Sequence, residues 1–156
     1  MPAIAAQELT TAMTEQLVME WYEALDQHAP VEELVRHVVS DGLVMSFPEG
    51  TLEGVEAFRD WYRTVTHRFF DEVHVVRSAT IGPRAADGAD EAGADVRVVQ
   101  VIVNWQTRVW TPPASHSQWL GFDAHQTWTV ALEDGAARIR SYAVDRLLPM
   151  PGSAAL

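Results

Sequence analysis

Apolar residues recur at spacings of three and four along the first half of the chain, which is the pattern of amphipathic helices. One such stripe runs from Leu9 to Leu25, and another runs from Val55 to Phe69. Between them, Pro30 suits the first position of a second, shorter helix, which the segment Ser40-Asp41-Gly42 ends. The pattern therefore predicts three helices in the N-terminal half.

Beyond Asp71 the apolar residues alternate with polar ones, as in strands that bury one face. Asp134-Gly135 is a two-residue hairpin signal, and Pro48 to Gly54 is interpreted as a turn. Helices followed by antiparallel strands predict an α+β fold. The expected strands are Leu43–Phe47, Val73–Ile81, Val96–Trp110, Gln118–Leu132 and Ala137–Leu148.

The length of 156 residues, with 47% apolar and 21% charged residues, is enough for one domain with a real core. No repeat or linker divides the chain. We expect a core over residues 9–148, a flexible N-terminus over 1–8, a mobile hairpin tip over 84–95 and a C-terminal tail over 149–156.

Two absences restrict the chemistry. The chain has no cysteine and no lysine, which excludes thiol nucleophiles, disulfides, Cys-ligated zinc, Schiff-base lysines and Walker-type phosphate loops. The net charge of −11 argues against nucleic acid and acidic membrane surfaces as partners. No apolar run approaches the ~20 residues of a membrane span, and residues 1–7 do not read as a signal peptide, so we expect a soluble, cytoplasmic protein.

Several motifs in this order resemble the nuclear transport factor 2-like superfamily, in particular its SnoaL-like branch. The segment Trp21-Tyr22-Glu23-Ala24-Leu25 is similar to the end of the first helix in that superfamily. Phe47-Pro48-Glu49-Gly50, followed by Gly54-Val55-Glu56-Ala57-Phe58-Arg59, resembles its entry into the third helix. Glu133-Asp134-Gly135 with Tyr142-Ala143-Val144-Asp145 resembles its closing hairpin.

The resemblance implies a cone-shaped, curved antiparallel sheet wrapped around three N-terminal helices, with an internal apolar pocket. Members of the superfamily include isomerases, polyketide cyclases, dehydratases and binding proteins without catalysis, so the fold does not select one activity. At the positions of the polar groups of ketosteroid isomerase this chain has Trp21, Phe47 and Thr127 or Thr129, which cannot perform that chemistry.

In SnoaL-like cyclases the acid–base aspartate lies on the last strand, where this chain has Asp145. If Asp145 points into the cone, burial raises the pKa of its carboxyl toward that of a general base; the alternative is an ion pair with Arg140 or Arg146, or exposure to solvent. His125 is the nearest candidate for the accompanying histidine. Simple hairpin pairing places it opposite Val144, and a one-residue change in the hairpin places it opposite Ala143 or Asp145, where an Asp–His pair would form. It is equally compatible with an outward-facing position.

The other histidines have plainer interpretations. His74 alternates with Val76 and is a candidate to line the pocket. His67 is interpreted as a structural residue at a helix C-terminus, and His28, His37 and His116 as surface residues. No metal-ligand spacing occurs in the sequence, so we expect neither a metal nor a cofactor.

Most of the aromatic residues are expected in the core, but a pocket would also be lined by some of them. Asn104 alternates with Gln106 and Arg108 and is either a polar group in the pocket or part of a solvated face. The expected substrate-binding residues are Trp21, Phe47, Trp61, Tyr62, Asn104, Trp128 and Tyr142.

The leading hypothesis is cofactor-free acid–base catalysis on a hydrophobic carbonyl compound, of polyketide type, by cyclisation, isomerisation or dehydration. Asp145 would remove a proton, while His125 or His74 with Tyr62 would stabilise the enolate. The alternatives are a non-catalytic ligand-binding or accessory protein and a structural subunit. The superfamily also implies a homodimer, with Trp105, Trp110 and Trp119 as candidates for the contact.

Overall fold

The computed structural model describes residues 8–84 and 95–156, so most of the expected mobile tip and N-terminus lies outside the described residues. The first helix, α1 (Thr11–Asp26), begins two residues later than the apolar stripe because Thr10 caps it. The hydroxyl oxygen of Thr10 accepts a hydrogen bond from the backbone nitrogen of Met13 at 3.1 Å.

The second helix is shorter than expected. α2 (Val31–Val35) ends early because the chain then runs beside the last strand, β6 (Ala136–Pro149). The backbone nitrogen of Ile139 donates to His37 at 2.7 Å, and Val39 donates back to Ile139 at 2.9 Å. This packing buries His37, which corrects its interpretation as a surface residue.

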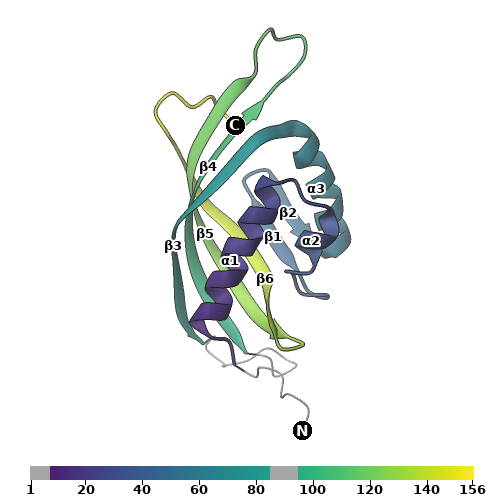
Figure 1. Cartoon of the computed structure of the whole chain (residues 1–156), viewed down its shortest axis with the longest axis vertical. Helices are drawn as coiled ribbons and strands as arrows, with labels where there is room; N and C mark the ends of the chain where they lie inside the picture. Colours follow the sequence, from purple (N-terminus) through teal and green to yellow (C-terminus); the bar gives the residue numbers. More distant parts are fainter. Residues whose placement is uncertain (1–7, 85–94) are drawn as a thin grey trace.

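Six strands form one sheet in the order β2-β1-β6-β5-β4-β3. The segment interpreted as a turn contains a short strand, β2 (Gly50–Glu53), which pairs with β1 (Val44–Phe47). After α3 (Val55–Arg68), the long strands are β3 (Phe69–Arg84), β4 (Val96–Val109), β5 (Gln118–Glu133) and β6. The long strands curve past α1, with α2 and α3 beside its C-terminal end (Figure 1).

The single α+β domain with a curved, mostly antiparallel sheet and three helices confirms the expected fold class. Its one parallel pair is β1 with β6. β3 is an edge strand and begins directly after α3, four residues before the predicted start at Val73. Among the described residues, no helix is long and apolar enough to cross a membrane.

The hairpin of β5 and β6 has a different register from the simple one. Asp134 and Gly135 both have positive φ and form the tight turn as predicted. Irregularities between Thr129 and Val130 and between His125 and Gln126 then shift the pairing, so that His125 lies opposite Arg146. The expected pairing of His125 with Val144 is therefore wrong.

Candidate functional site

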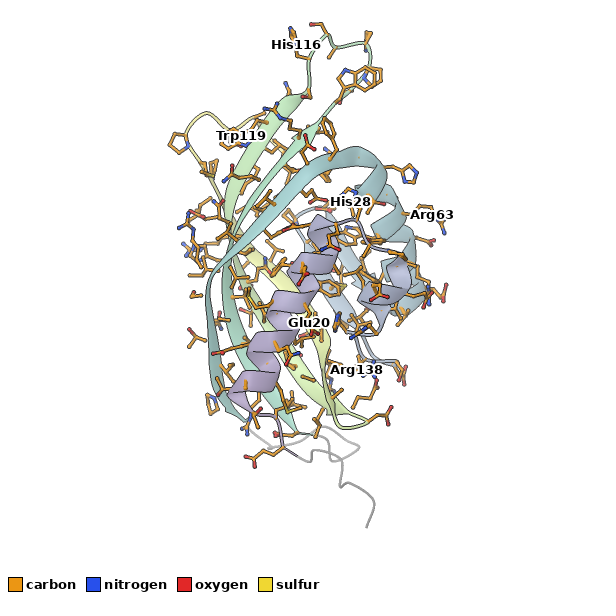
Figure 2. All side chains as sticks on the ribbon, in the orientation of Figure 1. Glu20, His28, Arg63, His116, Trp119 and Arg138 are labelled. Atoms are coloured by element: carbon orange, nitrogen blue, oxygen red, sulfur yellow. The ribbon has the colours of Figure 1, made fainter. Side chains whose placement is uncertain are left out.

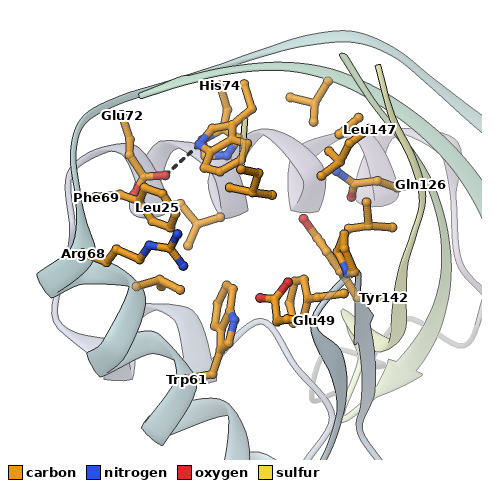
Figure 3. A pocket seen from close by; sticks show the side chains of 18 of the residues that line it. Leu25, Glu49, Trp61, Arg68, Phe69, Glu72, His74, Gln126, Tyr142 and Leu147 are labelled. Carbon is orange, nitrogen blue, oxygen red and sulfur yellow. Dashed lines mark hydrogen bonds between the residues drawn. The ribbon is translucent and has the colours of Figure 1, made fainter. Parts of the chain in front are cut away.

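A pocket of about 170 Å³ lies between the concave face of the sheet and the helices. Aromatic side chains make up much of its wall, and Figure 3 shows the indole of Trp61 pointing into it from α3. The polar residues that line it are Glu49, Thr66, Arg68, Glu72, His74 and Gln126. A cavity of this size is comparable to the roughly 150 Å³ that hold one benzene ring.

His74 of β3 forms a close contact with a carboxylate behind the pocket wall. Its Nδ1 lies 2.6 Å from Oδ1 of Asp26, the last residue of α1. The backbone nitrogen of His74 also donates to Oδ2 of Asp26 at 3.0 Å. Because β3 is an edge strand, this contact satisfies a backbone donor that has no strand partner and fixes the imidazole at the same time.

A carboxylate only accepts hydrogen bonds, so the contact with Asp26 places the imidazole proton of His74 on Nδ1. In the neutral ring, Nε2 then carries the free lone pair. The ring is held from both faces, stacked on Tyr22 at 4.8 Å and on Trp105 at 6.2 Å between ring centroids. The side chain is only 10% exposed, so it is a fixed proton acceptor at the pocket wall.

A buried hydrogen-bonded network lies at the inner end of the pocket. Tyr22 donates from its hydroxyl to Oε1 of Gln126 at 2.9 Å, and its hydroxyl lies 3.1 Å from that of Tyr142. Burial, more than the neighbouring hydroxyl, raises the pKa of Tyr22 well above its ordinary value. Burial raises the pKa of Tyr142 to about 12 as well. Both phenols therefore stay protonated donors throughout the neutral range.

These shifts predict that the native protein resists tyrosine ionisation. The chain has three tyrosines, and burial also raises the pKa of Tyr62 to about 12. A spectrophotometric titration should show almost no tyrosinate at pH ~10 and only about a tenth of each tyrosine ionised at pH ~11, while the unfolded chain titrates near 10. Since the folded pKa values are the higher ones, stability is fully present below pH ~10 and falls as the pH rises toward 12. One tyrosine titrating near pH 10 in the native state would contradict this.

The mouth of the pocket carries charges of both signs. Glu49 and Arg68 are exposed, and the guanidinium of Arg68 lies 5.0 Å over the ring of Phe69. Glu72 is deeper, with its side chain 10% exposed. Its Oε2 accepts a hydrogen bond from Nε1 of Trp105 at 2.9 Å, the dashed line in Figure 3.

The structure brings five of the predicted site residues to the pocket and leaves five outside it. Those that line it are Phe47, Trp61, Tyr62, His74 and Tyr142. Trp21 and Trp128 are instead 1% and 0% exposed and belong to the core behind the pocket. Asn104 lies on the opposite face of the sheet, where its amide donates to Asp123 at 3.0 Å.

Asp145 and His125 also lie outside the pocket, on the outer face of the sheet. Asp145 is exposed and accepts a hydrogen bond from the hydroxyl of Thr127 at 2.7 Å. Nδ1 of His125 lies 3.4 Å from the guanidinium of Arg146. A bulge of β6 turns Asp145 outward, and neither Asp145 nor His125 lines the pocket.

Sequence reasoning did not find Asp26 and Glu72. One signal for Asp26 was present, because a carboxylate at the last residue of a helix opposes the helix dipole and calls for a nearby partner. Glu72 precedes the strand start that the alternation predicted, so its side chain had no assigned face. The tryptophans predicted to form a dimer contact lie in different environments. Trp105 lines the pocket, whereas Trp110 is 51% exposed.

No protein-family profile and no curated protein matches the chain. Solved structures do match, at low identity. A protein of unknown function with a cystatin-like fold from Nostoc punctiforme shares 16% identity over 96% of this chain and 99% of its own, with a TM-score of 0.67.

A type 2 hexachlorocyclohexane dehydrochlorinase shares 15% identity over 93% of this chain and 91% of its own, with a TM-score of 0.71. A ketosteroid isomerase-like protein from Erwinia carotovora atroseptica shares 12% identity over 89% of this chain and 95% of its own, with a TM-score of 0.64. These likenesses show the cystatin-like fold, which is the fold that the resemblance implied.

Proposed function

We propose that this protein is an acid–base enzyme that removes a proton from a flat, hydrophobic small molecule, with His74 as the general base. The observation that carries the proposal is the 2.6 Å contact between Nδ1 of His74 and Asp26 at the wall of an aromatic pocket. It gives the imidazole a fixed tautomer and a fixed orientation, as a proton acceptor needs. Asp26 is the positioning residue of this pair.

The reaction best supported is a β-elimination or an isomerisation that begins with removal of a carbon-bound proton. Nε2 of His74 takes the proton, and the imidazolium that forms is stabilised by the carboxylate of Asp26. The names of two structural neighbours, a dehydrochlorinase and a ketosteroid isomerase-like protein, agree with these two reaction classes. The base in this proposal is His74 in place of the Asp145 expected from the sequence.

The pocket wall supports an aromatic or otherwise planar substrate with one polar group. Phe47 and Trp61 are stacked at 4.5 Å and form a flat wall. Nε1 of Trp61 is buried and has no hydrogen-bond partner among the described residues, so it is a free donor for a substrate oxygen.

The base can be tested without the natural substrate by using 5-nitrobenzisoxazole, a flat aromatic probe that opens to a coloured cyanophenolate when the proton on C3 of its isoxazole ring is removed. Wild-type protein should open it faster than acetate-buffer or free imidazole controls. His74→Gln should lower kcat/KM by about 10³-fold, within the usual range for a general base. Asp145→Asn should leave the rate unchanged, because that carboxylate lies on the other face of the sheet.

A ligand-binding protein without catalysis would give a different result. It would quench tryptophan fluorescence on binding 5-nitrobenzisoxazole while the probe stayed intact by mass spectrometry. A rate that His74→Gln does not change would remove His74 as the base. The homodimer remains a proposal, for which the exposed Trp110 and the half-buried Trp119 are the candidate contacts outside the pocket.

A further inference from the structure

Two histidine–carboxylate pairs connect the end of α1 to the start of β3. In one pair β3 supplies the histidine, and in the other it supplies the carboxylate. Asp26 pairs with His74, and two residues further along, His28 pairs with Glu72. In the first pair the imidazole belongs to the pocket wall and the carboxylate lies behind it. In the second pair the carboxylate belongs to the pocket wall and the imidazole lies behind it. The pocket therefore receives one imidazole and one carboxylate from neighbouring positions of a single strand.

Glu72 is held as firmly as His74. Its Oε1 lies 2.7 Å from Nε2 of His28, and its Oε2 accepts the indole hydrogen of Trp105 at 2.9 Å. Figure 3 shows Glu72 and His74 side by side along the pocket wall. The contact between Glu72 and His28 holds one proton that either group can carry, which places this pair for proton transfer at the pocket wall.

His28 connects this carboxylate to a second cavity. A cleft of about 480 Å³ between α1 and the segment around α2 is lined by His28 and by the exposed residues Glu23 and Glu33. His28 follows the C-terminal end of α1 (Figure 2). Its backbone has φ of 47°, in the left-handed region that most residues avoid, and its nitrogen donates to Leu25 at 3.0 Å. The turn thus holds the imidazole between the two cavities.

We propose that Glu72 is a second catalytic residue, the general acid that protonates the leaving oxygen in an elimination, and that His28 passes protons to it from the outer cleft. This deepens the proposed function and rests on it. His74 breaks the C–H bond, the electron pair forms the new π bond, and the bond to the leaving oxygen breaks. Glu72 gives its proton to that oxygen and is reprotonated by the imidazolium of His28.

The number of protons on the enzyme is the same before and after one turnover. His74 gains one proton and Glu72 loses one, so the substrate releases a neutral leaving group, such as water or a phenol. Release of the proton from His74 and uptake of one by His28 from solvent restore both pairs. The step needs no oxidant, reductant or co-reactant. The substrate class that follows is a compound whose leaving group is a poorly acidic oxygen, such as a β-hydroxy carbonyl compound.

The test compares leaving groups of different acidity in the benzisoxazole probe. An acid helps a poor leaving group more than a good one, so Glu72→Gln should lower kcat/KM for unsubstituted 1,2-benzisoxazole by about 10²-fold and for the 5-nitro compound by less than about fivefold. Glutamine keeps the size of the side chain and its acceptor but has no transferable proton. Asp26→Asn should lower both rates by the same factor.

The role of His28 is tested by removing its side chain and adding free imidazole to restore the rate. Gly tolerates the positive φ at this position, so His28→Gly keeps the turn and opens a space of imidazole size. Its rate on 1,2-benzisoxazole should fall about tenfold and recover when imidazole is added to the solution. His116→Gly is the matched control, because His116 lies at the tip beyond β4 and β5, far from His28 (Figure 2), and its rate should neither fall nor respond to imidazole.

The outcomes separate this inference from the proposed function. A wild-type protein that does not open either probe, or a His74→Gln variant with full rate, overturns the proposed base and the inference with it. If His74→Gln abolishes the rate but Glu72→Gln lowers both probes equally, only the acid role of Glu72 is overturned. Loss of rate in His28→Gly without recovery in imidazole overturns the proton transfer through His28.

Discussion

Asp26→Asn will lower kcat/KM for 5-nitrobenzisoxazole by about 10²- to 10³-fold, although the substituted atom never touches the substrate. The carboxylate of Asp26 accepts two hydrogen bonds, one from the backbone nitrogen of His74 at 3.0 Å and one at Nδ1 at 2.6 Å. Asparagine has a single oxygen acceptor. If that oxygen keeps the backbone donor, its amide group faces Nδ1 and donates to it.

The imidazole is then held in the opposite tautomer, with its proton on Nε2, and it can no longer accept a proton there. Nitrogen-15 NMR of the histidine ring reports the tautomer directly and should show the exchange in the variant. Asp145→Asn is the matched control, with the same chemical change at a carboxylate that contacts Thr127. Full rate in Asp26→Asn together with the changed tautomer would show that His74 is not the base.

Trp128→Ala will lower the free energy of unfolding by about 4 kcal/mol, the usual cost of removing a buried large aromatic side chain. Trp128 is 0% exposed and packs against Trp21, Tyr22 and Tyr142. Its indole nitrogen also donates to Gln126 at 2.8 Å. Urea denaturation should give the free-energy loss, and the melting temperature should fall by about 10 °C for a domain of this size.

Trp110→Ala makes the same change at a side chain that is 51% exposed and donates to the backbone of Ala114. We expect a loss below about 1 kcal/mol there. Trp128→Phe should recover part of the lost stability, because the ring keeps most of the buried contact area. A loss in Trp128→Ala no greater than that in Trp110→Ala would mean that Trp128 is not part of the core.

The periodicity of apolar residues was sufficient for the helices and long strands because burial of one face imposes a repeat that is local in sequence. It failed where an element has few apolar residues of its own, or where it depends on a partner far along the chain. β2 pairs only with β1 and packs few apolar residues, and Pro48, Gly50 and Gly54 give its surroundings the composition of a turn. The second helix stops at Val35 because the chain that follows bonds to β6, about a hundred residues away.

The sequence by itself determined an acidic α+β domain. Its family resemblance predicted an aromatic pocket, and five of the ten predicted site residues line the pocket of the structure: Phe47, Trp61, Tyr62, His74 and Tyr142. Only the tertiary structure decided which titratable groups meet. A single-residue bulge reverses the face of every following side chain in a strand, and the bulge at Arg140 of β6 leaves Asp145 outside. His125 lies outside because it alternates with the inward-facing Ala124 and Gln126 of β5. The crossing of α1 over β3 brings Asp26 to His74 and His28 to Glu72, across more than forty residues of sequence. A local sequence pattern cannot predict these contacts, because they depend on how two elements pack against each other.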